Sequence, residues 1–228
     1  MPELQGPWLM AVVCVGLVYS IVLHELAHAV AALWFGDRTA RDQGRITLNP
    51  LPNLDWFGSV IVPVAATTLG GFVMGWAKPV PVIAENLRPR HVGGIVVALA
   101  GVVTHLLICA VLLAVLVILG RLEVLERGAP PPGPPAQLSH LAWSALAYLA
   151  KVNVALAIFN LLPIPPLDGH HVAKYLLPPV LRRHYERIGF LGMLLVFALL
   201  YWQQERYSRW TQYLFLEIYD VVRALVGN

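Results

Sequence analysis

Long apolar segments with almost no charge constrain the fold of this chain more than any other feature. Residues 8–35, 92–120 and 141–162 are each long enough to cross a bilayer, which takes about 20 residues. The chain is 58% hydrophobic and 13% charged, whereas soluble domains are about half apolar and about a quarter charged. Since backbone groups in lipid must be satisfied within helices or closed barrels, the pattern predicts an all-α polytopic membrane protein.

The rest of the chain adds shorter apolar segments. Residues 188–202 form a short candidate span, and 210–226 mix charged and apolar residues as an amphipathic or partly buried helix does. No Lys or Arg precedes the first apolar run, so we expect that run to be a retained helix and not a cleaved signal. We expect about 4–5 membrane helices in a single domain, 1–228, with a core at about 8–172 and C-terminal helices at 188–226.

Basic residues cluster in three loops, 36–55, 78–90 and 174–187, whereas loop 121–140 balances two Arg against two Glu. Cytoplasmic loops carry an excess of Lys and Arg, so we expect the first three loops inside and the last outside. This topology requires the Gly-rich apolar segment 56–77 to enter the membrane and return as a re-entrant hairpin, which is tolerated where protein or water surrounds the backbone. The end of the 141–162 helix then lies on the side where the first helix ends.

The loop sequence "RITL" at 45–48 alternates polar and apolar residues, which is typical of a strand. A membrane-spanning substrate hides its carbonyls in helical hydrogen bonds, and an edge strand can hold it extended instead. We therefore expect a short β segment near the functional site, together with the hairpin 56–77.

The first apolar run contains "LHELAHA", with His24, Glu25 and His28. The two histidines are one helical turn apart and face the same way, as two zinc ligands on one helix do. Glu25 is placed to take a proton from a metal-activated water without being a ligand itself. Charged and ionisable residues inside a membrane helix are costly, which favours a functional role over stray polar residues.

A catalytic zinc usually has three protein ligands and one open position, so a third ligand must come from elsewhere. The candidates near the membrane are His105, Asp168, His170 and His171. Asp168 follows prolines that break a helix, and Gly169 after it permits a tight turn. The alternative for the adjacent His170 and His171 is that they are solvated loop residues.

"HELAHA" in the first helix and "FNLLPIPPLDG" in a later segment together resemble the site-2 protease family of intramembrane zinc metalloproteases. The stretches "GRITLNPLPNLDWFG", "GWAKPVPV" and "LAG" at 99–101 are similar to the short bacterial members without a PDZ domain. The resemblance covers about residues 15–172, and the combination of the two metal motifs is much more specific than either alone.

This resemblance implies one Zn²⁺ per chain, with His24, His28 and Asp168 as ligands and Glu25 as the catalytic base. It also implies that Asn160 is a polar group near the reacting carbonyl, a candidate oxyanion donor. The alternative for Asn160 is an amide that only bridges helices.

The chain departs from the family pattern after "LAG", where Val102 and His105 stand in place of the usual Pro and Asn. His105 either lines the active site, where it tunes the zinc water or binds substrate, or is a core residue hydrogen-bonded across helices. Lys151, in the middle of another span, has no assigned role.

The sequence therefore favours a zinc-dependent intramembrane endopeptidase that cleaves a single-span membrane protein or a signal-peptide remnant. We expect a multi-pass protein of the inner cell membrane with its active site toward the cytoplasmic side. Its partners are the lipid bilayer and the substrate, with no nucleic acid, and a homo-oligomer remains open.

The alternative is a non-proteolytic metal-binding membrane protein, either a transporter or a pseudoenzyme scaffold. A transporter needs polar groups along several helices, and a pseudoenzyme should lack Glu25.

Overall fold

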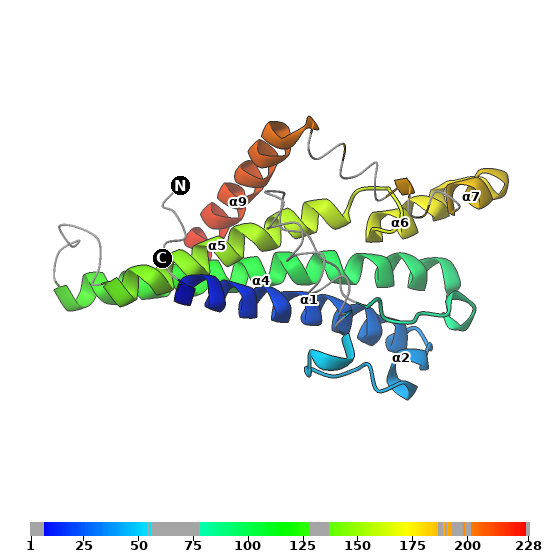
Figure 1. Cartoon of the computed structure of the whole chain (residues 1–228), viewed down its shortest axis with the longest axis horizontal. Coiled ribbons are helices and arrows are strands. Elements are labelled where there is room, and N and C mark those ends of the chain that lie inside the picture. The colour runs from blue at the N-terminus through cyan, green and yellow to red at the C-terminus, as the bar shows by residue number, and fades with distance from the viewer. Residues whose placement is uncertain are drawn as a thin grey trace. The chain divides into compact units, whose positions relative to one another are not determined.

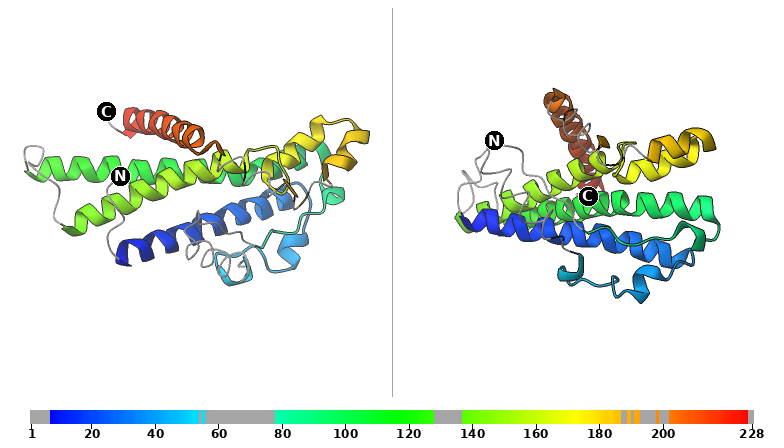
Figure 2. Two further views of the ribbon diagram at one scale, coloured as in Figure 1. Left: turned by 45° about the horizontal axis from the view of Figure 1, so that its top comes forward. Right: turned by 45° about the vertical axis from the view of Figure 1, so that its right-hand side comes forward.

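A computed structural model describes residues 7–53, 55, 78–127, 137–186, 189, 191, 192, 198 and 202–226. Its helices are α1 (Pro7–Trp34), α2 (Thr39–Asp42), η1 (Leu51–Asn53), η3 (Ala84–Asn86), α4 (Arg90–Arg127), α5 (Gln137–Asn160), α6 (Asp168–Leu176), α7 (Pro179–Glu186) and α9 (Gln204–Val226) (Figures 1 and 2). The described part of the chain is thus helical and contains no strand.

Among these described residues, three helical segments are long and apolar enough to cross a membrane. They are Ala11–Trp34, Arg90–Gly120 and Ala142–Asn160. The three long spans expected from the sequence are therefore confirmed. The hairpin predicted at 56–77 and most of the span predicted at 188–202 lie outside the described residues, so the total of about 4–5 membrane helices stays a prediction.

The short β segment expected at 45–48 is not found, because the backbone there bends on itself. Arg45 N–H donates to Ala40 O at 2.9 Å and Thr47 N–H donates to Arg45 O at 3.1 Å. A strand needs its alternating N–H groups directed at a partner strand, whereas these are used in local turns.

The chain divides into two compact units, 18–101 and a second one made of 1–17 and 102–228. In the second unit, α4, α5 and α9 meet in an apolar core. Its buried members are Cys109, Leu113, Leu116, Ala150, Val154 and Val222. The N-terminal part of α1 approaches α5 closely, since a Cβ on Gly16 would lie 2.6 Å from Leu149 Cδ1. The single domain predicted from the sequence stays a prediction.

The unit 18–101 contains the C-terminal part of α1, the loops that follow it and the start of α4. Helix α1 ends where Gly36 adopts a positive φ of 101°, a conformation that favours glycine at a helix C-terminus. Its small core contains Ala31, Ala32, Leu87 and Val97, with Val82 packed against them.

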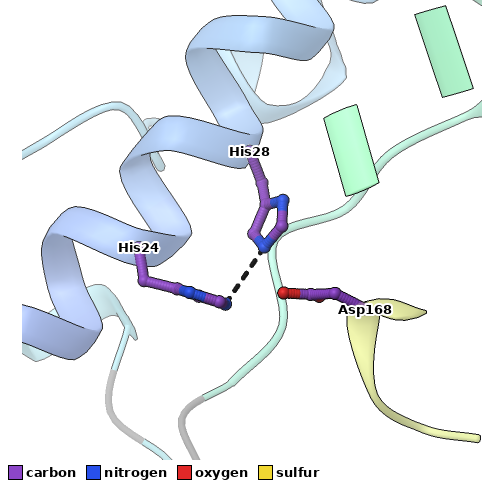
Figure 3. A group of neighbouring side chains, drawn as sticks. All are labelled: His24, His28 and Asp168. Atoms are coloured by element: carbon purple, nitrogen blue, oxygen red, sulfur yellow. Dashed lines mark hydrogen bonds between the residues drawn. The ribbon is translucent and has the colours of Figure 1, made fainter. Parts of the chain in front are cut away.

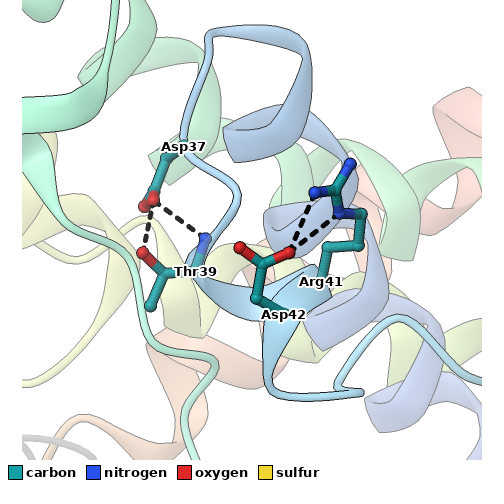
Figure 4. A network of polar contacts seen from close by, with 4 residues as sticks. All are labelled: Asp37, Thr39, Arg41 and Asp42. Carbon is teal, nitrogen blue, oxygen red and sulfur yellow. Dashed lines mark hydrogen bonds and ion pairs between the residues drawn. The ribbon is translucent and has the colours of Figure 1, made fainter.

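Asp37 joins the end of α1 to the loop before α4. Its carboxylate accepts bonds from Thr39 N–H at 3.1 Å and Thr39 Oγ1 at 2.5 Å (Figure 4). It also accepts bonds from Ile83 N–H at 2.6 Å and Asn86 Nδ2 at 3.0 Å. Burial raises the pKa of Asp37, but the bonds from Asn86, Thr39 and Ile83 outweigh burial and hold that pKa below its usual value.

Candidate metal centre

The HExxH motif lies on α1, inside the first candidate span. The Nε2 atoms of His24 and His28 are 3.1 Å apart (Figure 3), and the residues are only 7% and 8% exposed. Two nitrogens that bind one tetrahedral zinc at about 2.0–2.1 Å lie about 3.3 Å from each other. The imidazole pair therefore fits two positions of one zinc coordination sphere.

The tautomer of His28 is set by a backbone carbonyl. His28 Nδ1 lies 2.7 Å from Val97 O on α4. Because a carbonyl only accepts hydrogen bonds, Nδ1 carries the proton and the Nε2 lone pair is directed toward His24. Metal-binding histidines typically donate their other ring N–H in this way, which fixes the ring and makes it a better ligand.

Gly101 on α4 provides the room for these two rings. A Cβ at Gly101 would lie 2.3 Å from His24 Cε1, 2.5 Å from His24 Nδ1 and 2.5 Å from His28 Nε2. These separations are far below van der Waals contact. Only glycine at this position lets both imidazoles keep their places.

Glu25 has a specific backbone partner. Its Oε2 accepts a hydrogen bond of 2.9 Å from the N–H of Val80, and the residue is half-buried. The carboxylate that follows His24 is thus held at one oxygen by the loop that precedes α4.

In the other unit, Asp168 and Asn160 lie at the two sides of one tight turn. Asn160 is the last residue of α5 and Asp168 the first of α6, and both are half-buried. A Cβ on Gly169 would lie 2.2 Å from Leu161 O, so glycine is required for α6 to start this close to the end of α5. The turn predicted from the prolines and Gly169 is therefore present.

The two further histidines of this region have local partners. His170 Nδ1 lies 2.8 Å from Leu167 O, and the His170 and His171 rings are 3.8 Å apart. His170 is half-buried and His171 is exposed. Both histidines thus belong to helix α6 and not to a loop, and only His171 is exposed to solvent.

His105 is a buried residue hydrogen-bonded between helices, which is one of the two alternatives that the sequence left open. Its Nδ1 lies 2.8 Å from Asn153 Oδ1, and Asn153 Nδ2 donates to Leu149 O at 2.9 Å. His105 is 2% and Asn153 0% exposed. Lys151 is half-buried on α5.

The sequence does not predict three groups that shape the centre, namely Val97 O, Val80 N–H and Gly101. The first two are backbone groups, and the residue type gives no sign of what a backbone group will contact. Gly101 does leave a signal, because a glycine inside a helix costs about 1 kcal/mol relative to alanine and commonly marks a close approach.

These features define a class of protein: a membrane metalloprotease with its HExxH motif inside a membrane-spanning helix. The comparison with family models makes this specific, since the model of peptidase family M50 matches residues 12–201. The chain belongs to peptidase family M50, the site-2 protease family. The resemblance found in the sequence is confirmed.

The chain is similar to several named zinc metalloproteases over most of its length. It is 37% identical over 193 residues to "Putative zinc metalloprotease YwhC" of Bacillus subtilis, which covers 83% of this chain and 81% of that protein. It is 31% identical over 189 residues to "Putative zinc metalloprotease Rip2" of Mycolicibacterium smegmatis, covering 82% of this chain and 66% of the relative. The Rip2 of Mycobacterium tuberculosis is 28% identical over 171 residues, 75% of this chain and 59% of that protein. No solved structure matches.

The family and the names of these relatives identify the chain as a zinc metalloprotease. Its apolar helices identify it as a membrane protein.

Proposed function

We propose that the protein is an intramembrane endopeptidase in which one zinc ion is held by His24, His28 and Asp168. The three side chains are labelled in Figure 3, and each offers one atom of a type that zinc binds. The observation that carries the proposal is the pair of facing Nε2 atoms, 3.1 Å apart, inside the candidate span Ala11–Trp34.

Glu25 and Asn160 have separate roles in the proposed hydrolysis of the peptide bond. A zinc ion held by His24, His28 and Asp168 would supply Lewis acidity at the site. Glu25 takes the proton of the attacking water and passes it to the nitrogen of the leaving amine. The C–N bond breaks, the carbonyl carbon gains a hydroxyl group, and the amine gains the proton. Asn160 donates a hydrogen bond to the carbonyl oxygen as negative charge develops on it.

We propose membrane-spanning substrates, either a single-span protein or a signal-peptide remnant, because the HExxH motif lies within an apolar span. The basic loops 36–55, 78–90 and 174–187 support a multi-pass inner-membrane protein whose active site lies toward the cytoplasm. No nucleic acid is involved, and association of several copies is open.

The test measures zinc and proteolysis in the same preparations of wild type, Glu25→Gln and Asp168→Ala. Glu25→Gln is expected to keep zinc. Its kcat is expected to fall by about 10²–10⁴-fold, the usual contribution of a general base. Asp168→Ala is expected to lose zinc. A chelator should remove wild-type activity, and added Zn²⁺ should restore it.

His171→Ala is the matched control, since His171 is exposed and outside the proposed ligand set. It should keep both zinc and activity. Undiminished proteolysis in Glu25→Gln would overturn the mechanism. A zinc-loaded wild type that cleaves nothing would favour a metal-binding scaffold or transporter.

A further inference from the structure

The segment Lys78-Pro79-Val80-Pro81-Val82-Ile83 precedes η3 and runs without regular secondary structure beside the C-terminal part of α1. We call these six residues, 78–83, the strap. Proline has no backbone N–H, so between Lys78 and Val82 only Val80 can donate a backbone hydrogen bond. That single donor bonds Glu25 Oε2 at 2.9 Å.

The strap is anchored at its first residue by contacts that do not involve Glu25. Lys78 N–H donates to Asn53 O at 2.9 Å. Lys78 O accepts from Arg45 Nη2 at 2.7 Å, and Arg45 is only 6% exposed. A buried guanidinium with planar, fixed donor geometry is a stiff partner for a carbonyl.

The other end of the strap is anchored as firmly. Ile83 N–H donates to Asp37 Oδ2 at 2.6 Å, and Asp37 is 1% exposed. Val82 packs against the small apolar core around Ala31 and Ala32 at the end of α1. The N–H of Val80 is therefore held in place from both sides before any substrate arrives.

This arrangement matters because a glutamate side chain is flexible. Ordering such a long side chain costs rotamer entropy, and a general base must lie within hydrogen-bonding reach of the proton it takes. A bond from N–H to a carboxylate is charge-assisted and stronger than a neutral one. The bond restrains the carboxylate at Oε2.

We propose that the backbone N–H of Val80 positions the Glu25 carboxylate for proton abstraction, so that the strap is part of the machinery that orients the base. This rests on the proposed role of Glu25 as general base. Val80 is a positioning residue, since it acts through Glu25. Within the strap, the two flanking prolines leave Val80 as the one backbone N–H between Lys78 and Val82.

The test removes the backbone N–H of residue 80 and compares this change with the loss of the Val80 side chain alone. Val80→Pro lacks the donor, whereas Val80→Ala keeps it and loses only the side chain. Turnover is measured with a fluorescence-quenched Leu/Ala peptide of about 20 residues with a Gly-Ser break at its centre, in vesicles of phosphatidylethanolamine and phosphatidylglycerol. Zinc content and thermal unfolding are measured on the same preparations.

Val80→Pro is expected to lower kcat about ten- to hundredfold, part of what a general base contributes, with KM changed less than about twofold and zinc retained. Val80→Ala is expected to keep kcat close to wild type. If the proline variant does not fold, valine 80 is replaced by its α-hydroxy acid, which exchanges N–H for an ester oxygen. The same loss of kcat is then expected.

Unchanged kcat in the proline or ester variant would overturn the inference, as would an equal loss in Val80→Ala. Glu25→Gln separates this outcome from failure of the proposed function. If Glu25→Gln is zinc-loaded and inactive while the ester variant is fully active, only the positioning role of Val80 is wrong. If Glu25→Gln itself remains active, the role of Glu25 as base is wrong.

Discussion

At the scale of single residues, the imidazole pair depends on backbone of α4 more than on other side chains. Val97 O fixes the ring of His28 at 2.7 Å, and Gly101 leaves the space that both rings occupy. Neither contribution can be replaced by a polar side chain. Substitutions on α4 should therefore affect zinc binding although α4 supplies none of the proposed ligands.

Gly101→Ala tests this dependence. Its Cβ would lie 2.3 Å from His24 Cε1, and overpacking of this kind costs about 1–3 kcal/mol. The expected result is a zinc affinity weakened about ten- to hundredfold, measured by competition with a chromophoric chelator.

Gly120→Ala is the control on the same helix. Its Cβ would meet Trp143 Cη2 at 3.3 Å, and no histidine is among its nearest neighbours. Zinc affinity there should stay at the wild-type value. Equal affinities in Gly101→Ala and wild type would show that the rings shift without loss.

At the scale of elements, α4 and α5 are joined by a polar contact inside an apolar interface. His105 and Asn153 are both fully buried and are hydrogen-bonded to each other. Interhelical hydrogen bonds in membranes are worth about 0.6–2 kcal/mol. The pair therefore specifies the alignment of the two helices while contributing modestly to stability.

His105→Leu should lower the free energy of unfolding in micelles by about 0.5–2 kcal/mol, because Asn153 loses that donor. The double variant His105→Leu, Asn153→Leu should be more stable than the sum of the two single changes predicts. Circular dichroism during thermal unfolding measures all four proteins. Strict additivity would mean that the two residues act independently.

Asp37 connects α1 with the loop that carries the strap, and its lowered pKa makes this connection dependent on pH. A carboxylate whose pKa is lower in the folded state stabilises above its unfolded pKa, about 3.9. That contribution is lost as the pH falls through the lowered, folded value.

Asp37→Asn should therefore destabilise the protein by about 1–3 kcal/mol at pH 7. The difference from wild type should persist down to about pH 4 and shrink below it. Asp42→Asn is the control, because its ion pair with Arg41, 2.9 Å long, is exposed and contributes little. A wild-type–variant difference that does not change with pH would refute this reading.

At the scale of the whole molecule, α4 exposes apolar side chains along much of its length. Val103, Leu107, Val111 and Ile118 are 50%, 61%, 62% and 46% exposed. Their spacings of four, four and seven residues keep them on one side of the helix. An apolar row of this length matches contact with lipid, which is the environment that the span Arg90–Gly120 requires.

Single cysteines at Leu107 and Val111, in a chain with Cys14→Ser and Cys109→Ala, should resist a charged maleimide in vesicles. Arg41→Cys, in an exposed position of a basic loop, should react, and only from the cytoplasmic side if the basic loops lie inside. Mass spectrometry of the labelled protein reads out both. Ready labelling of Leu107→Cys would contradict lipid contact, and labelling of Arg41→Cys from outside would reverse the topology.

The amino-acid sequence by itself determined the helical membrane class, the three long spans and the pair of histidines one turn apart. It also indicated the turn at Gly169. These are local properties, because span length, helical periodicity and the positions of proline and glycine act within a few neighbouring residues. The prediction of a strand at "RITL" was wrong, because alternation of polar and apolar residues is also a local property. It does not show whether a partner strand is available.

Only the tertiary structure decided which groups surround those residues. Val97 O lies 69 positions from His28 in the sequence, and Val80 N–H lies 55 positions from Glu25. Gly101 is likewise far in the sequence from both histidines that it contacts. A backbone carbonyl or N–H has no identity in the sequence until folding places it. His105 likewise received its partner, Asn153, from the packing of α4 on α5. The side-chain types of the centre therefore predict its chemistry from the sequence. The orientation of those side chains depends on backbone groups that only the fold brings close to them.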